Sequence, residues 1–377
     1  MKHRQECLCH NPRPMPARLI LEDGTVYAGE AFGATANSIG EVVFNTSLTG
    51  YQEIATDPSY RFQIVVMTYP HIGNYGIEAA VAQNEQAQVA GFVVRDAIAE
   101  PSNAQSEMPL AEYFTRNGIS AIQGVDTRAL TRHIRNLGAM RGMITSENDR
   151  SVESIVEEIR RAPSMSGLDL VQRVTALRPY TFDEPPAKPT KRIALYDFGV
   201  KRDILRHLSQ EGCDVTVYPA TTHADEILAQ HFDGVMLSNG PGDPEPVTYA
   251  QENIRHLIGK IPIFGICLGH QLLGLALGGR TYKLKFGHRG GNHPVKDLRS
   301  GRVEITAQNH GFAVDPDSLN ANDIEHTHIN LNDQTLEGFR HKSEPVLEVQ
   351  YHPEAAPGPH DSFHLFGEFM NLIDEWK

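Results

Sequence analysis

The second half of the chain alternates short apolar runs with segments of helical spacing, and no other feature restricts the fold as much. The apolar runs, each typical of a buried strand, are RIALYDFG, DVTVYPA, GVMLS and IPIFGI. The segments that follow them, each typical of a helix, are KRDILRHLSQEG, ADEILAQHF, YAQENIRHLIGK and HQLLGLALGG. Strand and helix units in succession favour a parallel sheet covered on both faces. We therefore predict a doubly wound, mostly parallel α/β domain over residues 191–377.

The first half is predicted to form a separate domain. Residues 179–191 read PYTFDEPPAKPTK, and the four prolines of this stretch interrupt any periodic pattern, as in a linker. Before it, SVESIVEEIRRA is predicted as a helix capped by Ser151, so residues 151–190 are interpreted as helix and linker. Glycine turns separate strand-like runs between residues 17 and 150, which indicates a mixed, β-rich α/β domain. Residues 1–16 are expected to form a disordered or extended tail.

Residues 261–279 carry no charge, and nineteen such residues would be long enough to span a bilayer. The stretch nevertheless contains Pro262, five glycines and the polar pair His270 and Gln271, which suit a membrane helix poorly. We interpret it as a short buried strand followed by a helix, with Cys267 on the turn between them. No membrane span is expected.

The charge and the cysteine content of the chain restrict the classes of partner and the cellular compartment that we expect. The 377-residue chain has a formal net charge of −13 and no basic run, which argues against nucleic acid or an anionic membrane as the main partner. Its first residues lack the apolar segment of a signal peptide, so a cytoplasmic location is expected. Cys213 and Cys267 are expected to be free thiols. We predict no metal site, because the spacing and the second ligand pair of a zinc knuckle are missing around Cys7, Cys9 and His10.

The sequence GICLG, between the predicted strand and helix, has the G-x-C-x-G form of a nucleophile elbow. Gly265 and Gly269 lack Cβ atoms, which lets the strand end and the first helical turn approach each other around Cys267. The free N–H groups and the positive dipole end of the helix would point at the sulfur and favour a thiolate. A buried core cysteine is the alternative, and the motif alone leaves both interpretations open.

Further segments could complete a thiol active site. In EVQYHPEAAPGP, the proline after His352 favours an extended chain, in which His352 and Glu354 point to the same side. Glu354 could then orient the imidazole, and His352 could protonate a leaving amine and later activate water. In SNGPGDP, the N–H of Gly240 could form an oxyanion hole with that of Leu268. TAQNHGFAV, residues 306–314, is predicted as a loop. Ordinary turns are the alternative for all of these segments.

Several segments resemble a known family. MLSNGPGDP, GICLGHQLL and QYHPEA, in this order, resemble the class I glutamine amidotransferase domain, which has a flavodoxin-like fold. FNTSLTGYQEIATDPSY, TYPHIGNYG, GVDTRALTRHIR, KFGHRGGNHPVKD and TAQNHGFAVD resemble the small-chain family of carbamoyl-phosphate synthetase, and the likeness continues from about residue 17 to the end. It implies Cys267 as nucleophile with His352 and Glu354 as partners. It also implies that glutamine is held by Ser47, Gly240, Gly242, Leu268, Gln271, Asn309, Gly311 and Phe312.

The resemblance implies a glutaminase subunit. L-glutamine would be hydrolysed through a thioester to glutamate and ammonia, and the ammonia would pass through a tunnel to a separate large chain. That chain would use ATP, a divalent metal and bicarbonate to make carbamoyl phosphate for pyrimidines and arginine, in a higher assembly of heterodimers. The present chain has no G-x-x-x-x-G-K-[ST] motif, so no cofactor is expected in it. The alternatives are a stand-alone thiol hydrolase of γ-glutamyl amides and a non-catalytic regulatory module. Many relatives read HPEAS where this chain reads HPEAA, with Ala356 at the last position.

Overall fold

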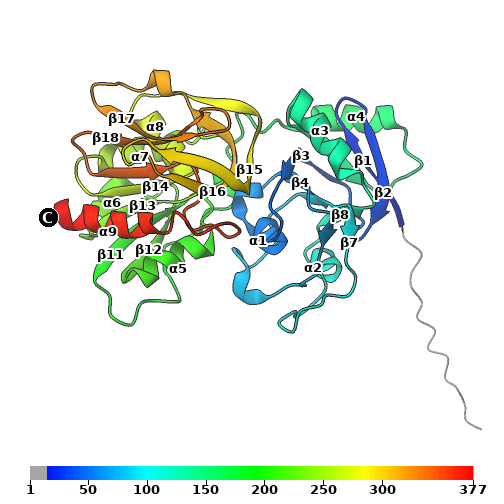
Figure 1. Cartoon of the computed structure of the whole chain (residues 1–377), viewed down its shortest axis with the longest axis horizontal. Helices are drawn as coiled ribbons and strands as arrows, with labels where there is room; N and C mark the ends of the chain where they lie inside the picture. The colour runs from blue at the N-terminus through cyan, green and yellow to red at the C-terminus, as the bar shows by residue number, and fades with distance from the viewer. Residues whose placement is uncertain (1–14, 377) are drawn as a thin grey trace, which may run out of the picture.

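The computed structural model describes residues 15–376, which form two domains lying side by side (Figure 1). Outside the described residues lie most of the predicted tail and the three residues considered as metal ligands, Cys7, Cys9 and His10. Strand β1 (Met15–Leu21) starts within the expected tail, because Met15 and Pro16 pair with β2 (Val26–Ala31). Met15 and Pro16 therefore belong to the N-terminal domain and not to a tail.

The N-terminal domain is a closed barrel, which leaves no free sheet edge. Its strands follow one another around the barrel as β1, β2, β8 (Ser120–Gln123), β6 (Gly91–Val93), β4 (Gln63–Met67), β3 (Ser38–Asn45) and β9 (Met140–Thr145). The other elements of this half are α1 (Tyr51–Thr56), η1 (Pro58–Tyr60), β5 (His71–Ile72), η2 (Ala79–Val81), β7 (Asp96–Ala97), α2 (Leu110–Arg116), α3 (Thr127–Leu137) and α4 (Val152–Arg161). The Ser151 side chain accepts a hydrogen bond from the N–H of Ser154, so it caps α4 as predicted. The mixed, β-rich character of this half is confirmed.

The C-terminal domain is built on a six-stranded sheet whose strands run mostly parallel. Their order is β10 (Tyr180–Thr181), β12 (Cys213–Pro219), β11 (Lys191–Asp197), β13 (Gly234–Leu237), β14 (Ile263–Ile266) and β19 (Val346–Val349). The short antiparallel edge strand β10 comes from the proline-rich linker, and η3 (Val171–Arg173) precedes this linker. The doubly wound sheet is thus confirmed, and the linker supplies one of its edges.

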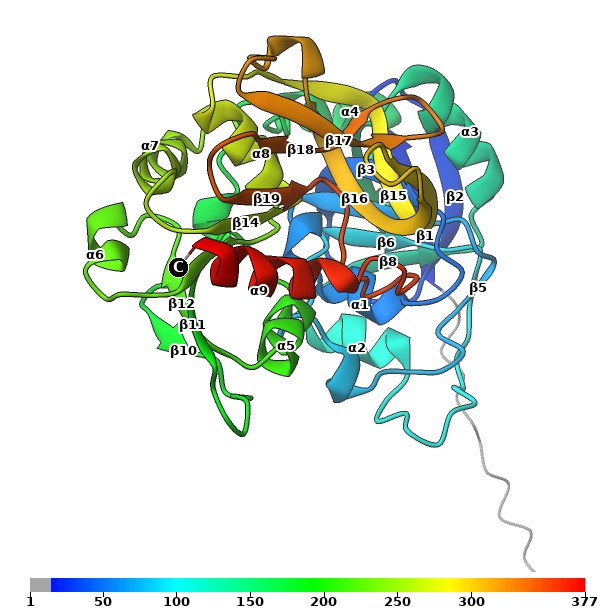
Figure 2. The ribbon, with the colours of Figure 1, turned by 60° about the vertical axis from the view of Figure 1, so that its left-hand side comes forward.

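Helices cover both faces of this sheet. Because side chains alternate along each strand, neighbouring residues of one strand face opposite layers of helices. Ala194 and Tyr196 of β11 face the core made with α6 (Ala224–Leu228), α7 (Thr248–Leu257) and α8 (Leu268–Ala276). Ile193 and Leu195 face the opposite core, which contains α5 (Arg202–Gln210) and α9 (His364–Trp376). In Figure 2, α9 and α5 lie below strands β14 and β19, whereas α7 and α8 lie above them. No helix among residues 15–376 is long and apolar enough to cross a membrane.

A second sheet has four antiparallel strands. In Figure 2 it lies between helix α8 and the barrel. Its order is β16 (Val303–Val314), β15 (Thr281–Asp297), β17 (Ile324–Asn330) and β18 (Leu336–His341), with η4 (Pro316–Ser318) between β16 and β17. The predicted loop at residues 306–314 is wrong, because these residues lie in β16 and pair with β15 along most of their length. The pairing brings Arg289 opposite Asn309, close to the carboxyl end of β14.

Candidate active site

Cys267 lies on the turn between β14 and α8, where the sequence predicts it. Its backbone has φ 54° and ψ −99°, a conformation that costs free energy in a residue with a Cβ atom and is typical of a nucleophile elbow. A Cβ atom on Gly269 would lie 2.3 Å from the carbonyl oxygen of Leu237, so only glycine allows this approach of helix to strand. The Cys267 N–H donates to the carbonyl oxygen of Val349 at 2.9 Å, which ties the elbow to β19.

His352 and Glu354 follow β19 and form a buried pair. Nδ1 of His352 lies 2.7 Å from Oε1 of Glu354, and the His352 N–H donates to the carbonyl oxygen of Ala307 at 2.9 Å. Burial alone would lower the pKa of His352, but Glu354 and Cys267 offset this effect and raise it to about 10. The Cys267 sulfur lies 3.7 Å from the carbonyl oxygen of Asn309, two residues after Ala307 on the same strand, so Cys267 and His352 both border β16. Within the described residues, Nε2 of His352 has no hydrogen-bond partner, which leaves it available for proton transfer.

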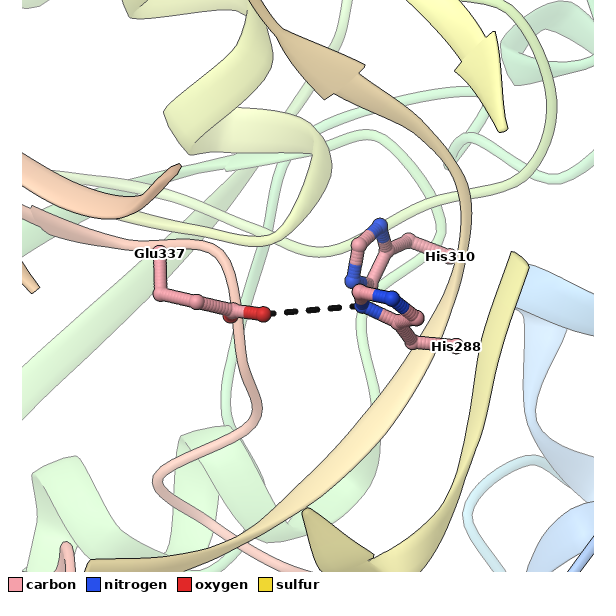
Figure 3. Close-up of side chains that lie close together, drawn as sticks. All are labelled: His288, His310 and Glu337. Carbon is pink, nitrogen blue, oxygen red and sulfur yellow. Dashed lines mark ion pairs between the residues drawn. The ribbon is translucent and has the colours of Figure 1, made fainter. Parts of the chain in front are cut away.

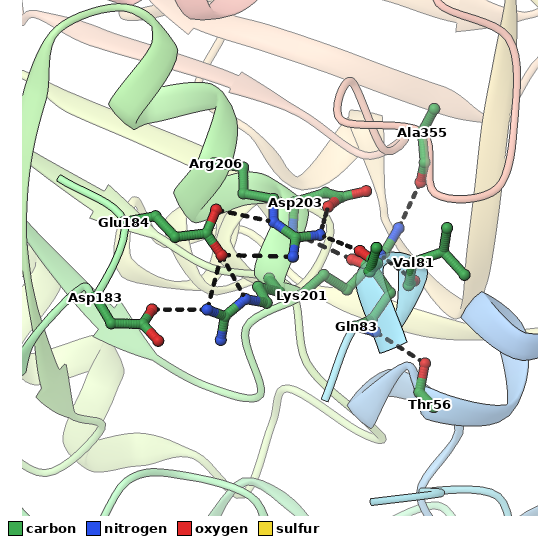
Figure 4. A network of polar contacts seen from close by, with 11 residues as sticks. Thr56, Val81, Gln83, Asp183, Glu184, Lys201, Asp203, Arg206 and Ala355 are labelled. Atoms are coloured by element: carbon green, nitrogen blue, oxygen red, sulfur yellow. Dashed lines mark hydrogen bonds and ion pairs between the residues drawn. The ribbon is translucent and has the colours of Figure 1, made fainter. Parts of the chain in front are cut away.

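Lys201 completes this buried group and is not among the residues predicted from the sequence. Its Nζ lies 2.8 Å from Oε1 of Glu354, and the Lys201 and Glu354 side chains are 3% and 0% exposed. Burial would raise the pKa of Glu354, whereas Lys201 and then His352 lower it to about 2. Nζ also donates to the carbonyl oxygen of Ala355 (Figure 4). One local signal could have indicated the residue, because a lysine directly before a helix is disfavoured by the helix dipole.

A small cavity of about 20 Å³ gathers Cys267 and most of the residues that the resemblance assigns to glutamine binding. They are Gly240, Gly242, Gln271, Asn309, Gly311 and Phe312. Nε2 of Gln271 donates to the carbonyl oxygen of Phe312 at 2.8 Å, so the elbow helix and β16 hold each other in place.

Ser47 and Leu268 are placed differently from the other six residues. Ser47 lines an adjoining cavity of about 20 Å³ together with His352, and Asn309 borders both cavities. The Leu268 side chain is buried in the core beneath α8, so only its backbone can serve the site. Within residues 15–376, neither the N–H of Gly240 nor that of Leu268 donates to another protein group. Two such N–H groups can hold the oxyanion of a tetrahedral intermediate.

The N-terminal domain forms one wall of the site. Oδ2 of Asp57 accepts a hydrogen bond from Nδ2 of Asn309 at 2.9 Å, and Ser59 Oγ accepts one from Nδ2 of Asn239 at 2.9 Å. All four side chains are buried. Neither Asp57 nor Ser59 was predicted from the sequence, because a contact between residues more than 150 positions apart leaves no local pattern. The site therefore lies at the interface of the two domains.

A second buried polar cluster borders the site (Figure 3). Ligand atoms of His288, His310 and Glu337 lie within 4.8 Å of one another, so these residues could approach a cation. Nε2 of His288 already lies 2.8 Å from Asp333, and its Nδ1 lies 3.5 Å from Glu337. Burial would lower the pKa of His288, but the two carboxylates raise it to about 9. The cluster is thus held together by a protonated His288 between two carboxylates. The absence of a metal site stays a prediction.

Comparisons with known proteins agree with this arrangement of domains. The model of the family "Carbamoyl-phosphate synthase small chain, CPSase domain" matches residues 19–144, and that of "Glutamine amidotransferase class-I" matches residues 194–372. The carbamoyl phosphate synthase small chain of Syntrophotalea carbinolica is 56% identical over 372 residues, covering 96% of this chain and 98% of the relative. That of Chlorobaculum tepidum is 54% identical over 366 residues, covering 96% and 99%.

Among solved structures, a putative GMP synthase protein from Thermoplasma acidophilum matches 49% of this chain and 95% of its own, with 22% identity and a TM-score of 0.42. This likeness is too weak to add to the assignment. The two family models, by contrast, match both domains, and the relatives align with this chain over nearly its whole length. The chain belongs to the carbamoyl phosphate synthase small chain family and carries a class-I glutamine amidotransferase domain.

Proposed function

We propose that Cys267, His352 and Glu354 form the catalytic triad with which this small chain hydrolyses the side-chain amide of L-glutamine. The observation that supports this most is the strained elbow of Cys267 beside the buried His352–Glu354 pair. Nε2 of His352 takes the proton of the Cys267 thiol, and the sulfur then attacks the amide carbon of glutamine. The oxygen of the resulting tetrahedral intermediate accepts hydrogen bonds from the N–H groups of Gly240 and Leu268.

Collapse of this intermediate breaks the carbon–nitrogen bond. His352 donates its proton to the leaving nitrogen, so ammonia departs and a glutamyl thioester of Cys267 remains. Water then gives a proton to His352 and attacks the thioester carbon, and the proton returns to sulfur as glutamate leaves. Glu354 keeps the imidazole oriented through both steps, and Lys201 holds Glu354 ionised.

Substrate binding uses both domains in this scheme. Gly242, Gln271, Asn309, Gly311 and Phe312 surround the amide end and the backbone of glutamine from the C-terminal domain. Ser47 reaches the substrate from the N-terminal domain, through the cavity that it shares with His352. The walls that the two domains contribute restrict the access of bulk water to the thioester.

Membership of the small-chain family indicates which partner this chain has. We propose that the ammonia passes through an internal tunnel to a carbamoyl-phosphate synthetase large chain, which makes carbamoyl phosphate from ATP and bicarbonate with a divalent metal. The closed route keeps ammonia unprotonated and away from water. The heterodimers assemble further and act in the cytoplasm, supplying pyrimidine and arginine biosynthesis. No cofactor is assigned to the small chain itself.

Co-purification with the large chain tests this proposal. A tagged small chain, expressed together with the large chain from the same organism, is expected to retain it through gel filtration, and the complex is expected to hydrolyse glutamine. A small chain that hydrolyses glutamine fully but never binds the large chain would be a stand-alone thiol hydrolase. A complex that binds but does not hydrolyse glutamine would make the small chain a regulatory module.

A further inference from the structure

Helix α5 of the C-terminal domain is capped by a residue of the other domain. Its N-cap position is Lys201, whose side chain has only donors and caps nothing. The first N–H groups of the helix go instead to Gln83, which lies in the loop after η2. The carbonyl oxygen of Gln83 accepts from the Arg202 N–H at 3.1 Å, and its Oε1 accepts from the Asp203 N–H at 3.2 Å.

Gln83 is itself firmly held in the N-terminal domain (Figure 4). Its N–H donates to Oγ1 of Thr56 at 2.9 Å, and its Nε2 donates to the carbonyl oxygen of Val81 at 3.0 Å. The residue is 2% exposed. Thr56 ends α1, and Asp57, which follows it, binds Asn309 of the glutamine pocket. The residue that caps α5 is therefore hydrogen-bonded to the segment that forms a wall of the site.

The cap fixes the residue next to it, which is Lys201. The Lys201 N–H donates to Oδ1 of Asn239 at 3.0 Å, and its Nζ reaches Glu354. A buried ammonium group directly before a helix is opposed by the helix dipole, so the backbone must be held for the ion pair to keep its geometry. Because Gln83 takes over the capping of α5, the side chain of the N-cap residue is free to serve Glu354.

We propose that Gln83 is a positioning residue for glutamine hydrolysis. It holds the start of α5 across the domain interface, so that Lys201 orients Glu354 and, through it, His352. The position of the N-terminal domain against α5 is thereby linked to the orientation of the His352 imidazole. This inference rests on the proposed triad and extends it to a residue of the other domain that does not touch the substrate.

The substitution Gln83→Ala removes Oε1 and Nε2 but keeps both backbone hydrogen bonds of the residue. A cleft of about 910 Å³ borders Gln83, so water can reach the N–H that the side chain leaves. The variant is therefore expected to fold. We expect kcat for glutamine to fall about fivefold, the rate equivalent of one capping hydrogen bond, with KM within about twofold of wild type.

A matched control lies one turn further along the same helix. Nη1 of Arg206 donates to the carbonyl oxygen of Ala80 at 2.8 Å, so Arg206→Ala also removes a contact between α5 and the η2 segment, but away from the helix start. Its kcat is expected to stay within about twofold of wild type. The measurement is steady-state glutaminase activity of the complete complex, with thermal unfolding recorded for every variant.

Two results would overturn the role of Gln83, namely an unchanged kcat in Gln83→Ala and an equal fall in Arg206→Ala. The first would remove the coupling, and the second would reduce it to general loosening of the interface. Failure of the proposed triad would give a different result, because Cys267→Ala would then keep the wild-type glutaminase rate.

Discussion

The buried pair of Lys201 and Glu354 makes a sharp prediction about stability. The substitution Glu354→Ala leaves the Lys201 ammonium group in a position where the wild-type side chain is 3% exposed, without its carboxylate. Breaking a buried ion pair from one side costs about 3–5 kcal/mol of unfolding free energy, because an uncompensated charge remains. Adding Lys201→Met removes that charge at similar side-chain length. The double variant is therefore expected to regain most of the lost stability while its glutaminase activity stays low.

Urea unfolding followed by tryptophan fluorescence measures this effect. Trp376 is the only tryptophan and lies in α9, so the signal reports on the C-terminal domain. With a slope of about 2–3 kcal/mol per molar urea, the midpoint of Glu354→Ala should fall by roughly 1–2 M and largely recover in the double variant. A double variant no more stable than Glu354→Ala would refute the reasoning, because the cost would then come from packing and not from charge.

The pKa values of Glu354 and His352 determine how this stabilisation depends on pH. The pKa of Glu354 is lowered from its ordinary 4.5 to about 2, so its contribution is present above pH 4.5 and is lost as the pH falls toward 2. The pKa of His352 is raised from 6.5 to about 10, so its contribution is present below pH 6.5 and is lost as the pH rises toward 10. The stability advantage of wild type over the double variant should be largest between these limits, from pH 4.5 to 6.5.

Three further predictions concern the reaction. A glutamine-like electrophile is expected to alkylate Cys267 before Cys213, because burial raises the pKa of Cys213 to about 12 and keeps its thiolate scarce; peptide mapping that finds Cys213 labelled first would contradict the elbow. Ser47→Ala is expected to raise KM for glutamine about two- to tenfold with kcat little changed, and steady-state constants equal to wild type would place Ser47 outside the site. His352→Ala is expected to lower kcat more than Glu354→Ala does, since the imidazole moves the proton and the carboxylate only orients it. The reverse order in steady-state assays would exchange the two roles.

The parts of the fold that could be predicted from sequence are those with a local period. Each strand and helix unit around β11 to β14 carries its own apolar pattern, so the doubly wound sheet follows from the sequence alone. The elbow is local as well, because Gly265, Cys267 and Gly269 lie within five residues. The cap of α4 by Ser151 depends only on neighbouring residues, and it is also confirmed.

Long-range pairing explains what the sequence did not show. Residues 306–314 are rich in polar and small side chains, which depress strand propensity, and they become a strand only through pairing with β15. The two partners of this pairing, β15 and β16, contain bulges that hide the alternation of side chains. Lys201 contacts a carboxylate 153 positions further along the chain, and Gln83 caps a helix of the other domain. Contacts of this kind have no local pattern, so only the folded structure reveals them.

The central claim is that this chain produces ammonia at Cys267 and leaves the ATP-dependent chemistry to its large partner. The most direct test is carbamoyl phosphate formation by the complete complex from ATP and bicarbonate, with either glutamine or an ammonium salt as nitrogen donor. In Cys267→Ser we expect glutamine-dependent synthesis to be lost, because a serine hydroxyl does not supply the thiolate, while synthesis from ammonium continues. Retention of both activities would remove Cys267 from the mechanism. Loss of both in an intact complex would show that Cys267 does more than hydrolyse glutamine.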